Sequence, residues 1–151
     1  MLTPDHKNPD HKNPGRESRD HKNPHAQSPG SPTSTTHKLT TRWLPGPHHP
    51  ADTPLLVSET DFRLHHIKDL PRACWAGWRL SRLWPGLEGA VALLLWADPL
   101  RRRIGSVSVW RSADDLDRFV RLRAHADIVR AYRGKGTLTT RTWESIGVPG
   151  G

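Results

Sequence analysis

The chain has little cysteine, little methionine and no long apolar run. Its 151 residues include one cysteine, Cys74, and one methionine. A single cysteine allows neither an internal disulfide nor a cysteine-based zinc site. The longest apolar run, Ala90–Ala97, has eight residues, whereas a membrane-spanning helix needs about 20. The first ten residues also lack the charged-then-apolar order of a secretory signal. We therefore expect no membrane partner and, by default, a cytoplasmic location.

Apolar residues are scarce overall, at 34%, where globular proteins have about 45–50%. The shortage lies in one part of the chain. Residues 1–54 hold seven apolar residues, about 13%, while residues 55–151 hold the other 44, about 45%. Ten of the 14 prolines also precede residue 55. The composition therefore predicts a disordered, repeat-containing tail over residues 1–54 and one folded domain over residues 55–151.

The tail is built on a repeated pentapeptide. Asp-His-Lys-Asn-Pro occurs at Asp5–Pro9, Asp10–Pro14 and Asp20–Pro24. A period of five matches neither a helix nor a strand, and each proline removes a backbone donor. The repeat histidines could collect zinc or nickel weakly, but solvated low complexity is the expectation. Exact short repeats also arise in duplicated DNA ahead of a start codon, so a start near Val57 is an alternative.

Turn signals divide the second part of the chain into regular segments. A helix is favoured where Pro71 occupies the first turn and Pro85-Gly86 stops the pattern. Ser112, followed three residues later by Asp115, resembles a capping box that opens a second helical region. The predicted elements are, in chain order, a strand over Leu55–Leu64, a helix over Arg72–Trp84, strands over Glu88–Ala97 and Arg103–Trp110, the helical region after Ser112, and a last strand over Thr137–Trp143.

The apolar stripe of the second helical region changes phase. Leu116 and Phe119 share one face, whereas His125, Val129 and Tyr132 share a face nearly opposite. Because a helix turns by about 100° per residue, one straight helix cannot bury both stripes against one sheet. The sequence therefore predicts a break or kink near Leu122–Ala124.

The order β-α-β-β-α-β is the ferredoxin-like order. It predicts an α+β domain with a four-stranded antiparallel sheet and both helices on one face. The strand over Glu88–Ala97 is apolar on both faces, so the face without helices also requires burial. A second copy of the sheet would supply it, and we therefore expect a homodimer that forms through the sheet.

The run Ser106–Arg130, SVSVWRSADDLDRFVRLRAHADIVR, resembles a segment of the antibiotic-biosynthesis-monooxygenase-like proteins. These proteins belong to the dimeric α+β barrel superfamily. The shared pattern is a strand ending in tryptophan, a polar cap, an aromatic residue on the helix, and Ala-His at a second helical turn; Trp84–Leu95 fits the same plan. The resemblance covers about residues 56–144 and implies a dimeric α+β barrel. Because this fold serves oxygenases, heme-degrading enzymes and members without known activity, the resemblance leaves the activity open.

The resemblance implies a small monooxygenase-like protein that needs no metal or organic cofactor and acts on, or binds, an apolar aromatic molecule. Such a protein needs an apolar pocket between helices and sheet and one proton-accepting group. His125, with an ordinary pKa near 6.5, is the candidate catalytic base. The candidate pocket-lining residues are Trp110, Phe119, Tyr132 and Trp78. Heme-degrading relatives carry a tryptophan about where Phe119 stands, which disfavours heme breakdown here.

Each candidate also has a purely structural interpretation. His125 fits a helix-start histidine that is hydrogen-bonded to the preceding loop, and Trp110 fits a core or dimer-seam residue. The alternative function is therefore a non-catalytic dimeric member of the same fold that binds a ligand or only dimerises. The net charge of +8 raises nucleic-acid binding as a third class. The helical arginines alternate with aspartates, as on a solvated helix face, and no RNA-binding strand motif is present. We therefore expect no nucleic-acid partner.

Overall fold

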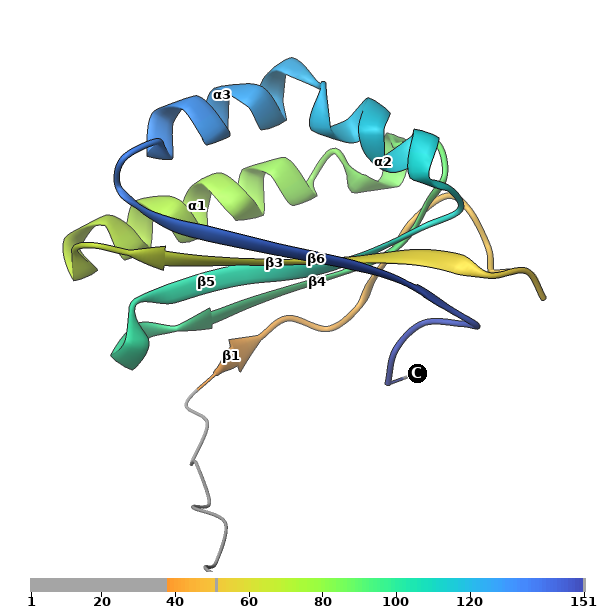
Figure 1. Cartoon of the computed structure of the whole chain (residues 1–151), viewed down its shortest axis with the longest axis horizontal. Helices are drawn as coiled ribbons and strands as arrows, with labels where there is room; N and C mark the ends of the chain where they lie inside the picture. Colours follow the sequence, from red (N-terminus) through yellow and green to blue (C-terminus); the bar gives the residue numbers. More distant parts are fainter. Residues whose placement is uncertain (1–37, 51, 151) are drawn as a thin grey trace, which may run out of the picture. The chain divides into compact units, whose positions relative to one another are not determined.

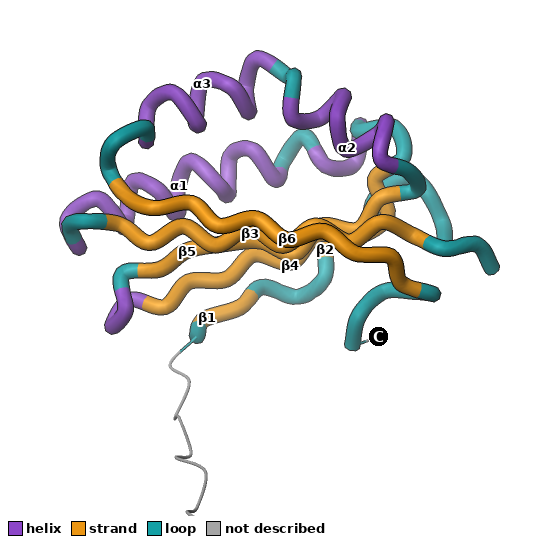
Figure 2. The backbone as a smooth tube through the Cα atoms, viewed as in Figure 1, coloured by secondary structure: helices purple, strands orange, loops and turns teal. Residues whose placement is uncertain are grey.

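One antiparallel sheet with three helices on a single face forms the folded part of the chain (Figure 1). This computed structural model describes residues 38–50 and 52–150. The tube view shows the same layers, with α1, α2 and α3 together above the strands (Figure 2). No helix among the described residues is long and apolar enough to cross a membrane.

The predicted order β-α-β-β-α-β is confirmed, with two short strands added before it. The elements are β1 (Leu39–Thr40), β2 (Leu44–Pro45), β3 (Leu55–Leu64), η1 (Ile67–Asp69), α1 (Leu70–Ser81), η2 (Trp84–Gly86), β4 (Ala90–Asp98), η3 (Pro99–Arg101), β5 (Arg103–Trp110), α2 (Ala113–Val120), α3 (Arg123–Tyr132) and β6 (Gly136–Ser145).

The four long strands lie in the order β4-β5-β3-β6, with every neighbouring pair antiparallel. This is the ferredoxin-like arrangement, in which the first and third long strands occupy the centre. The hairpin between β4 and β5 forms as expected, through η3, with Asp98 opposite Arg103. Arg102 takes the left-handed conformation at the end of η3, with φ of 54°, and this reverses the chain.

Residues 38–50 correct the prediction of a disordered tail. β1 and β2 both pair antiparallel with β4, and the amides of Thr41, Gly46 and His48 donate to carbonyls of β4. Trp43 packs on the buried cluster of β3, β4 and β5. The low apolar content did not predict this order, because two apolar side chains, Trp43 and Leu44, suffice when the backbone also pairs with the edge of a sheet. The repeats lie outside the described residues.

The break between the last two helices falls where the phase change predicts it. α2 ends at Val120, and Leu122 leaves the helical region with ψ of 137° before α3 begins. Ser112 caps α2 as expected, because its Oγ accepts from the amide of Asp115. The Asp115 carboxylate accepts from the Ser112 hydroxyl and from Arg111 and Arg118. This buried carboxylate therefore joins the end of β5 to the first two turns of α2.

Aromatic rings fill the space between the helices and the sheet. The ring centroids of Trp84 and Trp110 lie 4.8 Å apart, and those of Trp110 and Phe119 lie 5.2 Å apart. Both indoles are almost fully buried, in a cluster with Leu93 and partly buried leucines. The pocket predicted between helices and sheet is therefore occupied at this end by the chain's own side chains.

The face without helices is covered in part by the chain itself. Trp43 and Val148 pack on a buried cluster that includes Val57 and Ala92. Trp96 is 5% exposed and lies over Gly105, where a Cβ would meet its ring. The Nζ atom of Lys38 and the guanidinium carbon of Arg103 lie over the Trp96 indole, 4.5 Å and 5.6 Å from its ring centroid. The apolar pattern of β4 is thus satisfied to a large extent within one chain, which removes part of the reasoning for a partner sheet.

Candidate functional site

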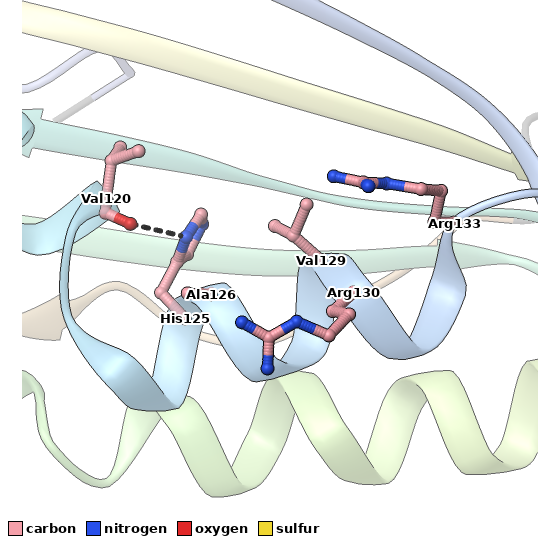
Figure 3. A pocket seen from close by; sticks show the side chains of 6 residues that line it. All are labelled: Val120, His125, Ala126, Val129, Arg130 and Arg133. Atoms are coloured by element: carbon pink, nitrogen blue, oxygen red, sulfur yellow. Dashed lines mark hydrogen bonds between the residues drawn. The ribbon is translucent and has the colours of Figure 1, made fainter.

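A surface groove of about 220 Å³ runs along α3 beside the break that follows α2 (Figure 3). Three apolar side chains line it, together with three that carry nitrogen. The lining residues are Val120, Ala126, Val129, His125, Arg130 and Arg133. Apart from Val120, they follow the spacing i, i+1, i+4, i+5 and i+8 from His125, with Arg133 as the residue that caps the end of α3, so one side of this helix supplies nearly the whole site.

His125 is held at the end of the groove by the backbone of the preceding helix. Its Nδ1 atom lies 3.2 Å from the carbonyl oxygen of Val120 (Figure 3). Because a carbonyl oxygen only accepts, Nδ1 carries the hydrogen and Nε2 of the neutral ring keeps its lone pair. The ring of Phe119 packs beside the imidazole at 4.9 Å between centroids.

The environment keeps this imidazole neutral. Burial lowers the pKa of His125, and the hydrogen bond to Val120 opposes that shift without cancelling it. A neutral ring with a fixed tautomer can accept a proton at Nε2 near neutral pH. The break supplies this geometry, because the helix turns aside after Val120 and leaves its carbonyl free of an intrahelical donor.

The other predicted pocket residues lie elsewhere. Trp110 is fully buried in the core, and Phe119 packs between Trp110 and His125. Tyr132 packs edge-on against Phe62 in the cluster under α1 and α3. Trp78 stacks on Trp75 on the outer side of α1, with 44% and 59% of the two residues exposed. Of the five candidate residues only His125 lines the groove.

The remaining lining residues were missed by the sequence reading. The apolar pattern of the sequence places Val129 on a buried stripe, and the alternation of arginines with aspartates places Arg130 and Arg133 on a solvated helix face. The signal that could have found them is the spacing from His125, since Val129 and Arg133 follow it by four and eight residues.

A second hollow lies on the sheet face without helices. It measures about 310 Å³ and is lined by Glu59, Asp61, Arg103, Thr139 and Arg141. Asp61 and Arg103 form an ion pair across β3 and β5. Its lining is charged throughout except for one threonine, so an apolar ligand has no surface to bind there. No cluster of metal-ligating side chains occurs among residues 38–50 and 52–150.

The sheet order and the helix layer define a ferredoxin-like α+β domain. Solved structures with the same fold include a mutant form of SnoaB, a cofactor-independent oxygenase from Streptomyces nogalater. The two chains share 15% identity with a TM-score of 0.54, over 67% of this chain and all of SnoaB.

Two further solved structures share this fold. The protein SO0527 from Shewanella oneidensis matches with a TM-score of 0.55 at 13% identity, over 60% of this chain and 90% of that one. A Lactobacillus acidophilus protein that carries the name "putative monooxygenase" matches at 0.54 and 10% identity, over 71% of this chain and 49% of that one. No family model and no curated protein matches the sequence. The resemblance stated from the sequence is therefore confirmed for the fold.

Proposed function

We propose that this protein binds a small apolar or aromatic molecule in the α3 groove and oxidises it with dioxygen, with His125 as the proton acceptor. The observation that carries the proposal is the Nδ1 contact with Val120, which leaves Nε2 of a neutral imidazole as a base in a partly apolar groove. The shared fold with SnoaB, a cofactor-independent oxygenase, supports the same class of reaction.

The proposed chemistry begins with loss of a proton from a phenolic or otherwise acidic aromatic substrate to Nε2. The resulting anion gives electrons to dioxygen, and one oxygen atom forms a second carbonyl at a ring CH carbon, which turns the phenol into a quinone. The second oxygen atom leaves as water with the hydrogen of that carbon and the phenolic proton. His125 takes part only as a base and returns its proton, so the balance needs no other reductant.

Dioxygen uptake with a panel of one- to four-ring phenols tests the proposal. We expect uptake with the unchanged chain and a loss of at least about tenfold in His125→Ala, as for removal of a general base. His66→Ala is the matched control, because this histidine is exposed and lies before η1, away from the groove. Equal uptake by His125→Ala would remove the imidazole from the mechanism.

A non-catalytic ligand-binding protein of the same fold is the second candidate. The observation that favours it is the same hydrogen bond, which also satisfies a carbonyl at the end of α2 and so gives His125 a structural role. This candidate predicts that ligands perturb the NMR signals of Val120, His125 and Val129 without any dioxygen uptake. Uptake that depends on His125 would contradict it.

We also propose a homodimer through the sheet face that lacks helices. Trp143 remains 40% exposed on this face, and Glu59 lies opposite Arg141 in the strand pairing. A two-fold partner would cover the indole and bring each carboxylate near a guanidinium of the other copy. Sedimentation should give a dimer for the unchanged chain and a monomer for Trp143→Glu, with Leu138→Glu, on the opposite face of β6, as the control. A monomeric unchanged chain would refute this proposal.

A further inference from the structure

The charge of the α3 groove has one sign. Two of its six lining residues are arginines and none is acidic. Arg130 donates to Asp127 at 3.2 Å, so part of its charge is compensated. Arg133 forms no ion pair with any of the residues that the structure describes. The groove therefore holds one compensated and one uncompensated guanidinium.

The apolar part of the groove lies beside these guanidiniums. Val120 and Val129 are 45% and 41% exposed, and Ala126 lies on the same helix face. Figure 3 shows the Arg133 side chain extending back along α3 toward Val129, so that its charge and the apolar surface are neighbours. A ligand that contacts both must carry an apolar face and an anionic edge.

The volume limits the size of that ligand. Pockets for drug-sized ligands measure about 300–1,000 Å³, and this groove measures about 220 Å³. One or two fused aromatic rings fit such a space, whereas a four-ring system would extend beyond it. The neutral imidazole adds no positive charge, so an anion in the groove has the arginines as its partners.

We propose that the ligand of the α3 groove is a one- or two-ring aromatic acid, whose anionic group pairs with Arg133 while its ring covers Val120 and Val129. This inference rests on the proposed function and specifies its substrate class. The planar guanidinium can bind a carboxylate with two parallel hydrogen bonds. The anion would lie at the Arg133 end of the groove, and in a substrate a phenolic hydroxyl on the ring would lie beside His125, where its proton is removed.

A matched pair of ligands tests the inference. 2-Naphthoate and 2-naphthamide have the same rings and nearly the same shape, but only the first is charged at pH 7. We expect the unchanged chain to bind 2-naphthoate at least about tenfold more tightly than the amide in titrations followed by NMR. In Arg133→Gln this preference should fall to within about twofold, while binding of the amide should stay the same.

Arg123→Gln is the control variant. Arg123 belongs to the same helix and is 96% exposed, but it does not line the groove. It should keep the preference for the acid. Equal binding of the two ligands by the unchanged chain, or an unchanged preference in Arg133→Gln, would overturn the inference and leave the proposed binding function intact. Binding of neither ligand, nor of any phenol of the panel, would overturn both.

Discussion

The imidazole of His125 and the carbonyl of Val120 meet across the break between two helices, with 3.2 Å between Nδ1 and the oxygen. The break itself follows from the change of apolar phase along the chain, which turns one helix into two. One hydrogen bond thus connects a feature of the sequence pattern with the tautomer of the proposed base. It also explains why the same residue satisfies both the catalytic and the structural interpretation.

The first prediction concerns the titration of His125. We expect its pKa to lie below the ordinary value near 6.5, because burial disfavours the charged ring. An NMR titration of the histidine ring protons, with His125→Gln for assignment, measures it. A pKa at or above about 6.5 would contradict the prediction.

The same shift has a consequence for stability. His125 is harder to protonate in the folded chain than in the unfolded chain. Above the unfolded pKa, near 6.5, the ring is neutral in both states and does not change the free energy of unfolding. As the pH falls below about 6.5, the unfolded chain binds the proton more readily, so the free energy of unfolding decreases. Urea unfolding at pH 7.5 and pH 5.5 should therefore show a loss of stability at the lower pH. That loss should be smaller in His125→Gln, and a loss of equal size in this variant would assign the effect to other groups.

The second prediction compares the two buried indoles. The Nε1 atom of Trp110 donates to the Ser108 hydroxyl at 3.0 Å, whereas Nε1 of Trp84 is buried without a partner among the described residues. Replacement of either by phenylalanine removes a similar volume, but only Trp110→Phe removes a hydrogen bond. We expect Trp110→Phe to cost about 1 kcal/mol more than Trp84→Phe in chemical denaturation. The reverse order would mean that the Trp84 nitrogen is bonded.

The third prediction concerns the carboxylate of Asp115, which is almost fully buried. Burial raises its pKa, but hydrogen bonds from Arg111, Ser112 and Arg118 outweigh burial and hold the pKa below its usual range. The ionised group therefore stabilises the fold above about pH 3.9, and this stability is lost as the pH falls. Asp115→Ala should cost about 1–3 kcal/mol at pH 7, as for loss of hydrogen bonds to a charged group, and less in acid.

Gly89 offers an independent test of the same contact. Its φ is +77°, and a Cβ at this position would meet the Asp115 carboxylate. Gly89→Ala should therefore destabilise the chain through both backbone strain and loss of the carboxylate's position. Gly86→Ala, where nothing lies near the added carbon, is the control and should change the free energy of unfolding by less than about 1 kcal/mol.

The fourth prediction concerns the edge of the sheet. The amides of Thr41, Gly46 and His48 donate to carbonyls of β4, so they should exchange with deuterium more slowly than exposed amides of the same segment. Trp43→Ala should accelerate exchange at all three, because the indole holds this segment on the sheet. Fast exchange of these amides in the unchanged chain would show that the segment does not pair with β4.

Local patterns were sufficient to predict most of the fold. β3 and β5 have the predicted bounds, because apolar runs and alternation specify strands wherever one side is buried. The helix break was predictable because it depends only on the angle between two apolar stripes. The added strands were not, since β1 and β2 consist of two residues each and gain their order from the long partner β4.

The site was harder to predict than the fold. His125 was identified, but the cavity was expected under the helices, where Trp84 and Trp110 in fact pack against each other. Packing of large rings is a tertiary property, and spacing along one helix does not show whether two indoles from different elements fill the same volume. The groove instead uses Val129 and Arg133, which local pattern assigns to the core and to solvent.

Residues 39–48 have a consequence for how sheets of different molecules can join. They occupy the β4 side of the sheet, while β6 pairs only with β3 among the described strands. The strands at this edge have only two residues each, and such short edge strands are a poor template for pairing with another chain. We therefore expect strand addition between molecules to occur at the long β6 edge, which joins molecules in pairs, and not to continue at the β4 side.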